Sequence, residues 1–216
     1  MRFRPAAPVA LESFIAVCEA AGRHGNGTME ISARGSMQVR GLTPASAPRF
    51  AAELAGLDLD IHEGVQAIAD PLPGDPSAAI DTGPIAAALH RAIAARPLRL
   101  APKISVVIDG GGSIGLDDLF ADIRLRATAG DAPRFALALA GTAESATPLG
   151  IVSADEAAGA AVDLLARIAA LGPGARAADL LPASPAPRAK REPAPRAEAV
   201  GVHRLKDGSA LGIGLA

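Results

Sequence analysis

Aromatic side chains are almost absent from this chain of 216 residues. They make up 2% of it, with no Trp and no Tyr. Proteins that hold single-stranded nucleic acid stack bases on aromatic rings, so this composition disfavours that class. An excess of basic charge is missing as well, because 21 Lys and Arg stand against 23 Asp and Glu. The formal net charge of -2 gives no reason to expect a nucleic-acid partner.

Cysteine occurs once, at Cys18. A single thiol excludes an internal disulfide framework and any all-cysteine zinc or iron–sulfur site held by this chain alone. The histidines are not spaced like metal ligands either, since none forms an i, i+4 pair or a cluster with carboxylates. We therefore expect no metal ligands and no cofactor held by the chain itself. On the predicted first helix, Cys18 is expected to pack inward as a small apolar residue.

Long apolar runs are also missing. Glu12 interrupts the Ala-rich start, which makes a poor signal peptide, and no run is long enough to cross a bilayer. We expect a cytoplasmic protein without a membrane partner. The length allows one large domain or two small ones.

The first part of the chain predicts a small α+β unit. Residues 9–21 are periodic, and Leu11, Phe14, Ile15 and Cys18 share one helical stripe. The other expected elements are strands at 2–4, 28–39 and 57–62 and a helix at 45–55 after Thr43-Pro44. This order is typical of half a ferredoxin-like unit.

The second part predicts a mixed α/β domain with an antiparallel sheet. A helix is expected at 80–96, and a helix at 153–171 carries the capping-box pair Ser153 and Glu156. Strands at 103–109, 121–128 and 134–140 suggest an antiparallel meander. After a Pro/Ala/Arg linker, residues 200–216 predict a hairpin around Lys206-Asp207-Gly208.

These shifts of composition predict four segments. They are a half domain at 1–66, a larger α+β domain at 67–181, the linker at 182–198 and the start of a second half-domain repeat at 199–216. Because a domain does not normally end on an opening strand, we expect the chain to be cut short.

The run Gly110-Gly111-Gly112-Ser113-Ile114-Gly115 matches the G-x-G-x-x-G pattern of dinucleotide sites. Such a site needs the last glycine to open a helix and an acid about twenty residues further on. Here an apparent strand follows, and Arg134 stands near the expected place of the acid. We interpret the run as a loop between antiparallel strands.

The most informative stretch is the predicted strand at 28–39 with its flanking turns. Ile31, Met37 and Val39 alternate with polar residues, so that one face suits a core and the other does not. The polar face carries Glu30, Ser32, Arg34, Ser36, Gln38 and Arg40. Guanidinium and amide groups in a row suit a planar ligand rich in carboxylates.

The same stretch resembles the nitrite/sulfite reductase ferredoxin-like half domain. The resemblance rests on Gly25-Asn26-Gly27-Thr28, Ser32-Ala33-Arg34 and Gln38-Val39-Arg40-Gly41. Later pieces follow in the order of that superfamily: Ala69-Asp70-Pro71, Pro102-Lys103, and Leu205-Lys206-Asp207-Gly208 with Leu211-Gly212-Ile213-Gly214. Within the superfamily the chain is most similar to the precorrin-3B synthases of cobalamin biosynthesis.

The resemblance implies a tetrapyrrole ligand, either a precorrin or sirohaem. By position in the motifs, Arg4, Ser32, Arg34, Gln38 and Lys103 match residues that contact the tetrapyrrole, and Arg40 lies close by. The full-length family enzyme is implied to carry a 4Fe-4S cluster, with sirohaem or non-haem iron, and to need an electron donor. Its implied reaction is an oxygen-dependent hydroxylation and lactone formation on precorrin-3A.

Three departures from the family pattern matter. The cluster cysteines are absent, Val65-Gln66 stand where an Arg is expected, and Ser105 replaces a second Lys of the reductases. The first hypothesis is therefore the N-terminal, tetrapyrrole-binding part of a precorrin-3B synthase-like oxidoreductase, inactive without the remaining C-terminal half. The alternative is a non-catalytic tetrapyrrole-binding module, or a fragment of a sirohaem nitrite/sulfite reductase.

Overall fold

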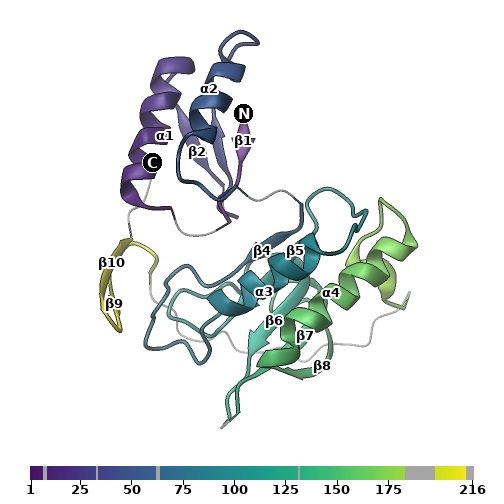
Figure 1. Cartoon of the computed structure of the whole chain (residues 1–216). Coiled ribbons are helices and arrows are strands. Elements are labelled where there is room, and N and C mark those ends of the chain that lie inside the picture. The colour runs from purple at the N-terminus through teal and green to yellow at the C-terminus, as the bar shows by residue number, and fades with distance from the viewer. Residues whose placement is uncertain (7–8, 33, 62–63, 131, 183–197, 213–216) are drawn as a thin grey trace. The chain divides into compact units, whose positions relative to one another are not determined.

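The structure is a computed structural model that describes residues 1–6, 9–32, 34–61, 64–130, 132–182 and 198–212 (Figure 1). It divides into two compact units, Met1–Gly64 and Val65–Ala216, which we describe separately. The linker predicted at 182–198 lies outside the described residues, apart from its first and last positions.

The first unit is a three-stranded antiparallel sheet with two helices packed on one face. Strands β1 (Arg2–Phe3), β2 (Met29–Ile31) and β3 (Met37–Val39) pair in the order β1-β3-β2. The helices are α1 (Leu11–His24) and α2 (Ala47–Ala55). The shared core consists of Phe3, Val17, Ala20, Ala21, Met37, Val39, Phe50 and Leu54.

The single strand predicted at 28–39 is wrong, because the chain folds back on itself to form a hairpin. Gly35 has a φ of +73°, which favours glycine, and the amide of Ser32 donates to the carbonyl of Ser36 at 2.9 Å. The turn pairs Ile31 with Met37 and Glu30 with Gln38. The predicted alternation holds in β3, where Met37 and Val39 are buried, but it fails at Ile31 of β2, which is 44% exposed.

The predicted apolar stripe of α1 is wrong at three of its four positions, since of these residues only Phe14 packs against the core. Val17, Ala20 and Ala21 are buried, whereas Leu11 and Ile15 are 67% and 47% exposed and Cys18 is exposed. The small alanines allow the helix to approach the sheet closely, so the core side of α1 is set by size and not by the largest apolar residues.

Two predictions for the segments around α2 have different outcomes. Thr43 and Ser46 exchange hydrogen bonds between hydroxyl and amide groups ahead of the helix, which begins two residues later than predicted. No strand forms at 57–61, the described part of the range predicted as strand, where Ile61 makes an isolated bridge with Pro5.

The second unit is built on a five-stranded mixed sheet. Its strands, in the order in which they lie, are β4 (Gln66–Ile68), β5 (Ser105–Asp109), β6 (Ala121–Ala127), β7 (Arg134–Gly141) and β8 (Thr147–Ser153). Helices α3 (Gly83–Ala94) and α4 (Ala154–Leu171) pack against the sheet and each other, with a short 3-10 helix, η1 (Ala177–Leu180), after α4 (Figure 1).

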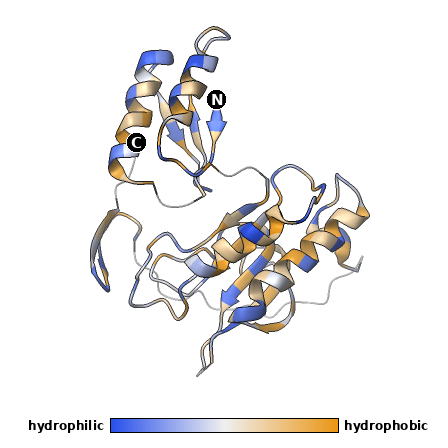
Figure 2. Ribbon diagram, viewed as in Figure 1, coloured by the Kyte–Doolittle hydropathy of each residue, from blue (hydrophilic) through white to orange (hydrophobic). Residues whose placement is uncertain are grey.

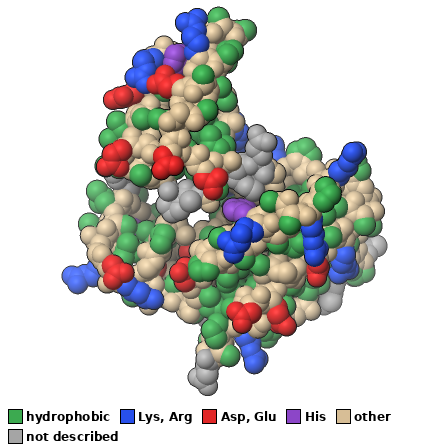
Figure 3. All heavy atoms as spheres, viewed as in Figure 1, with side chains coloured by type: hydrophobic (Ala, Val, Ile, Leu, Met, Phe, Trp, Pro, Cys, Tyr) green, Lys and Arg blue, Asp and Glu red, His purple; other side chains and the backbone are tan. Residues whose placement is uncertain are grey.

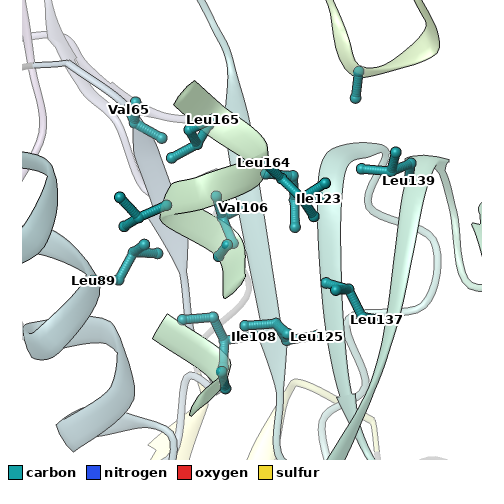
Figure 4. Close-up of a cluster of buried hydrophobic side chains, with 14 of the residues drawn as sticks. Val65, Leu89, Val106, Ile108, Ile123, Leu125, Leu137, Leu139, Leu164 and Leu165 are labelled. Atoms are coloured by element: carbon teal, nitrogen blue, oxygen red, sulfur yellow. The ribbon is translucent and has the colours of Figure 1, made fainter. Parts of the chain in front are cut away.

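The core of this unit lies between the sheet and the two helices. Leu89 of α3 and Leu165 of α4 meet Val106, Ile108 and Ile123 of the sheet (Figure 4). Figure 2 colours much of these helices and strands as hydrophobic. Each fully buried Leu, Ile or Val side chain stabilises the fold by roughly 1.5–3 kcal/mol relative to exposure.

The predicted antiparallel meander is wrong in its first pair. Strands β5 and β6 are parallel, whereas the neighbouring pairs β6–β7 and β7–β8 are antiparallel. The connection at 110–120 therefore crosses over the sheet. The buried guanidinium of Arg124 fixes it by donating to the carbonyls of Leu119 and Leu116 at 2.6 and 2.9 Å.

The predictions for the chain's later elements are largely confirmed. The Ser153 hydroxyl and the Glu156 carboxylate form both halves of a capping box at α4. Strands β9 (Gly201–Leu205) and β10 (Gly208–Gly212) form the predicted hairpin. Among the helices in the described ranges, none has the length and apolar character needed to span a bilayer.

An ion pair that the sequence did not reveal connects the residue before η1 to the sheet of the second unit. Asp122 on β6 is 1% exposed and accepts from Nε and Nη2 of Arg176 at 2.9 and 2.8 Å. The amide of Ser105 also donates to this carboxylate, at 3.1 Å. Removal of the guanidinium would leave a buried carboxylate without its counter-charge.

We expect Arg176→Ala to lower the free energy of unfolding by about 2–3 kcal/mol, since a buried pair is broken but the Arg side chain is partly exposed. Urea titration monitored by circular dichroism measures the change. Arg96→Ala is the control, because Arg96 pairs with Asp163 on the surface and should cost less than about 1 kcal/mol. Equal losses in the two variants would contradict this account.

Candidate functional site: the arginine face

The outward side of the first unit's sheet carries charged residues. Phe3, Met37 and Val39 point to the helices, so their neighbours along each strand point away from them. Strand register places Arg2 opposite Gln38, and Gln38 opposite Glu30, in one row across the sheet. We call this surface, with Arg4 just after β1 and Arg34 in the hairpin turn, the arginine face.

Arg4 is the most unusual side chain of this face. It is half-buried, and within the described residues its buried Nε and Nη1 atoms have no hydrogen-bond partner. Burial, and then the nearby charges of Arg2 and Arg34, lower the pKa of Arg4 below its usual range. Because a buried donor without an acceptor costs about 1–3 kcal/mol, this guanidinium is suited to an incoming anion.

The hairpin turn presents Arg34. Ser32 accepts a hydrogen bond at its hydroxyl from the amide of Ser36, at 3.1 Å, and so closes the turn. Ser32 thus shapes the site through the backbone, while Gln38 lies half-buried on β3. Arg34 is half-buried at the tip of the turn.

Arg40 is exposed and already engaged. Its Nη2 atom donates to Glu30 at 2.6 Å, and this hydrogen bond raises the pKa of Arg40 and lowers that of Glu30. A ligand carboxylate at Arg40 would have to compete with Glu30.

The glycines of the predicted motif hold the base of the hairpin together. A Cβ atom at Gly25 would collide with the carbonyl of Arg40, and one at Gly41 would collide with Asn26. The amide of Asn26 donates to the carbonyl of Arg40 at 3.1 Å. Close backbone approach therefore explains why Gly stands at both positions.

Lys103 is not one of the residues that form the arginine face of the first unit. It belongs to the second unit, is exposed, and has a φ of +67° in the turn before β5, which begins at Ser105 and not at Lys103. The structure thus collects Arg4, Ser32, Arg34, Gln38 and Arg40 on the first unit and leaves Lys103 in the second.

Arg2 is a residue of the arginine face that the sequence analysis did not name. Its position two residues before Arg4 on a strand places both side chains on the same face. This i, i+2 spacing could have identified Arg2 from the sequence, but a strand as short as β1 gives only a weak alternation pattern.

The glycine-rich run does not form a dinucleotide site. Residues 110–120 are all described, and the chain passes from β5 through them into β6 without a helix. A pyrophosphate would therefore lack the helix N-terminus that such sites use. The described residues also contain no group of three or more His, Cys, Asp or Glu side chains placed to hold a metal ion.

The run instead meets two carboxylates. The amide of Gly110 donates to Asp70 at 2.9 Å, and Ser113 donates to Asp75 through its amide and hydroxyl, each at 2.6 Å. Burial raises the pKa of Asp70 to about 6. Burial alone would raise the pKa of Asp75 too, but hydrogen bonds from Ser113 and Ser77 outweigh it and hold that pKa well below its usual range.

Comparison with known proteins agrees with this architecture. Residues 8–57 match the model of the nitrite/sulfite reductase ferredoxin-like half domain. A precorrin-3B synthase of a Sinorhizobium species is 40% identical over 218 residues, covering 95% of this chain and 48% of the relative. The predicted resemblance to the nitrite/sulfite reductase ferredoxin-like superfamily is confirmed. The chain spans about half the length of the curated relative that it matches.

A solved structure shares the fold. The NirA protein of Mycobacterium tuberculosis superposes with a TM-score of 0.70 over 98% of this chain and 46% of that chain, at 17% identity. This likeness confirms the predicted α+β fold class, a ferredoxin-like half domain followed by a mixed domain.

Of the two groups that the superfamily implies, the residues of this chain fit a tetrapyrrole but not a 4Fe-4S cluster. A 4Fe-4S cluster needs cysteine thiolates, and the chain has one cysteine, which is exposed on α1. The cluster therefore does not fit the residues of this chain. The carboxylates of a tetrapyrrole fit the unsatisfied guanidinium of Arg4.

We expect Asp70→Asn to stabilise the second unit at pH 7 by roughly 1–2 kcal/mol, after allowance for partial exposure. The raised pKa of Asp70 favours the folded state below about pH 4, and this contribution is lost as the pH rises through about 6. Asn keeps the acceptor for Gly110 and cannot ionise.

Urea titrations at pH 4.5 and pH 7 measure this effect. Asp81→Asn is the control, because Asp81 is exposed in the same loop and accepts from the amide of Gly83 at 3.0 Å. A gain in Asp70→Asn that is the same at both pH values would contradict the assignment.

Proposed function

We propose that this chain is the tetrapyrrole-binding part of a precorrin-3B synthase-like oxidoreductase of cobalamin biosynthesis. The observation that carries the proposal is the half-buried guanidinium of Arg4, whose Nε and Nη1 lack partners among the described residues. The similarity to a precorrin-3B synthase supplies the ligand class. A tetrapyrrole carries several carboxylates on a flat macrocycle, which suits cations spread over one sheet face.

In this proposal each site residue has a distinct role. Arg4 binds ligand carboxylate through charge-assisted hydrogen bonds donated by its Nε and Nη1 atoms, which lie on different edges of the guanidinium plane. Arg34 binds from the hairpin turn that Ser32 closes, and the amide of Gln38 donates beside them. Arg40 assists at the edge of this face. Lys103 is the tetrapyrrole-binding residue proposed for the second unit.

The role of the chain is to bind and orient the substrate. The proposed reaction, an oxygen-dependent hydroxylation with lactone formation on precorrin-3A, needs a metal centre that these residues do not supply. An electron donor and the remaining part of the enzyme are the proposed partners.

The fragment of a sirohaem reductase is the weaker proposal. Ser105 stands where the reductases carry a second Lys, and it is fully buried in β5. A Ser there offers no cation to a small oxyanion. Precorrin is accordingly the proposed ligand, ahead of sirohaem.

We expect Arg4→Ala and Arg34→Ala each to weaken tetrapyrrole binding about tenfold, because each removes a charge-assisted hydrogen bond worth about 1.5–3 kcal/mol. Uroporphyrin, a stable tetrapyrrole with carboxylates on every pyrrole ring, serves as the probe, and quenching of its fluorescence reports binding to the full chain.

Arg49→Ala is the matched control. Arg49 lies exposed on α2, where its Nε donates to the carbonyl of Ala45 at 3.4 Å, and its loss should leave the affinity unchanged. Unaltered affinity in Arg4→Ala and Arg34→Ala would refute the proposed site.

A further inference from the structure

Two groups can be distinguished among the basic side chains of the first unit. Those near carboxylates are paired: Arg23 with Glu19 and Glu53, His24 with Glu53, and Arg40 with Glu30. Arg2 and Arg4 form the other group, since neither has an ion pair with any described carboxylate. Among the described residues, these two guanidinium groups therefore leave uncompensated positive charge on one face.

Arg2 occupies a defined place on the arginine face. It is exposed, it lies opposite Gln38 in the strand register, and it points away from the core that Phe3 enters. Its Cα lies about 7 Å from that of Arg4 along the strand. The only carboxylate in its row is Glu30, about 10 Å away across two strand spacings and held by Arg40.

We infer that Arg2 is a further ligand-binding residue of this site, and that Arg2, in place of Arg40, holds a second carboxylate of the tetrapyrrole beside the one at Arg4. This inference rests on the proposed function.

The electrostatics of the face support this choice. Burial, and then the positive charges of Arg2 and Arg34, lower the pKa of Arg4, so both charges repel the Arg4 guanidinium in the free protein. A ligand with one carboxylate would relieve only part of this repulsion, whereas a polycarboxylate relieves it at two or more positions. Arg40 offers less, because a ligand there must displace Glu30 from a 2.6 Å contact.

The test compares Arg2→Ala with Arg40→Ala in the full chain, with uroporphyrin as the probe. We expect Arg2→Ala to raise the Kd about fivefold, and Arg40→Ala, which removes only the assisting residue at the edge, to raise it about twofold. Arg2→Lys keeps the charge but loses the planar fork, so it should recover part of the affinity. The Kd of Arg2→Ala should also depend less on salt concentration than that of the wild-type chain.

The outcomes separate this inference from the proposed function. If Arg4→Ala weakens binding while Arg2→Ala binds as tightly as the wild-type chain, the inference fails and the proposed function stands. If the wild-type chain does not bind uroporphyrin, both fail. The thermal unfolding midpoint of Arg2→Ala shows whether this variant is still folded. If the midpoint falls, the affinity of Arg2→Lys is the test, and an affinity equal to that of the wild-type chain would contradict the inference that Arg2 binds through its planar guanidinium.

Discussion

The alternation of side chains along β1, β3 and β2 is the constraint on which the candidate site depends. Burial of Phe3, Met37 and Val39 against α1 and α2 fixes the register of all three strands. A shift by one residue would turn these apolar side chains outward and bring arginines into the core. The apolar face thus determines the position of the arginine face, although it makes no contact with a ligand. Near-neutral net charge is compatible with such a local cluster, and the face visible in Figure 3 mixes acidic and basic side chains.

The two units use partly buried arginine in opposite ways. Arg176 meets the carboxylate of Asp122, which also accepts backbone hydrogen bonds, so the charge of this pair is satisfied within the fold. Arg4 has Nε and Nη1 atoms without partners in the described part of the chain, next to two like charges. The first arrangement stabilises a fold, whereas the second costs stability unless an anion arrives. This contrast separates a structural arginine from a candidate binding residue.

The sequence was informative where local chemistry decides the structure. The capping box of Ser153, the β9–β10 hairpin and the alternation around Gln38 all depend on neighbouring residues, and all were predicted. The hairpin turn at Gly35 was missed because a continuous alternation hides a reversal of direction, and the parallel pairing of β5 and β6 depends on a crossover that no local pattern encodes. At the site, the motif positions gave Arg4 and Arg34, but the pairing of Arg40 with Glu30 and the shared face of Arg2 and Arg4 required the strand register.

The most direct measurement of the central claim follows the side chain of Arg4 itself. Nuclear magnetic resonance of the arginine Nε–Hε groups, assigned by single substitutions, reports hydrogen bonding at each guanidinium during titration with uroporphyrin. The account predicts that the Arg4 resonance moves downfield and saturates with the probe, while the resonance of Arg49 on α2 stays in place. Saturable binding of the probe with no change at Arg4 would contradict the account.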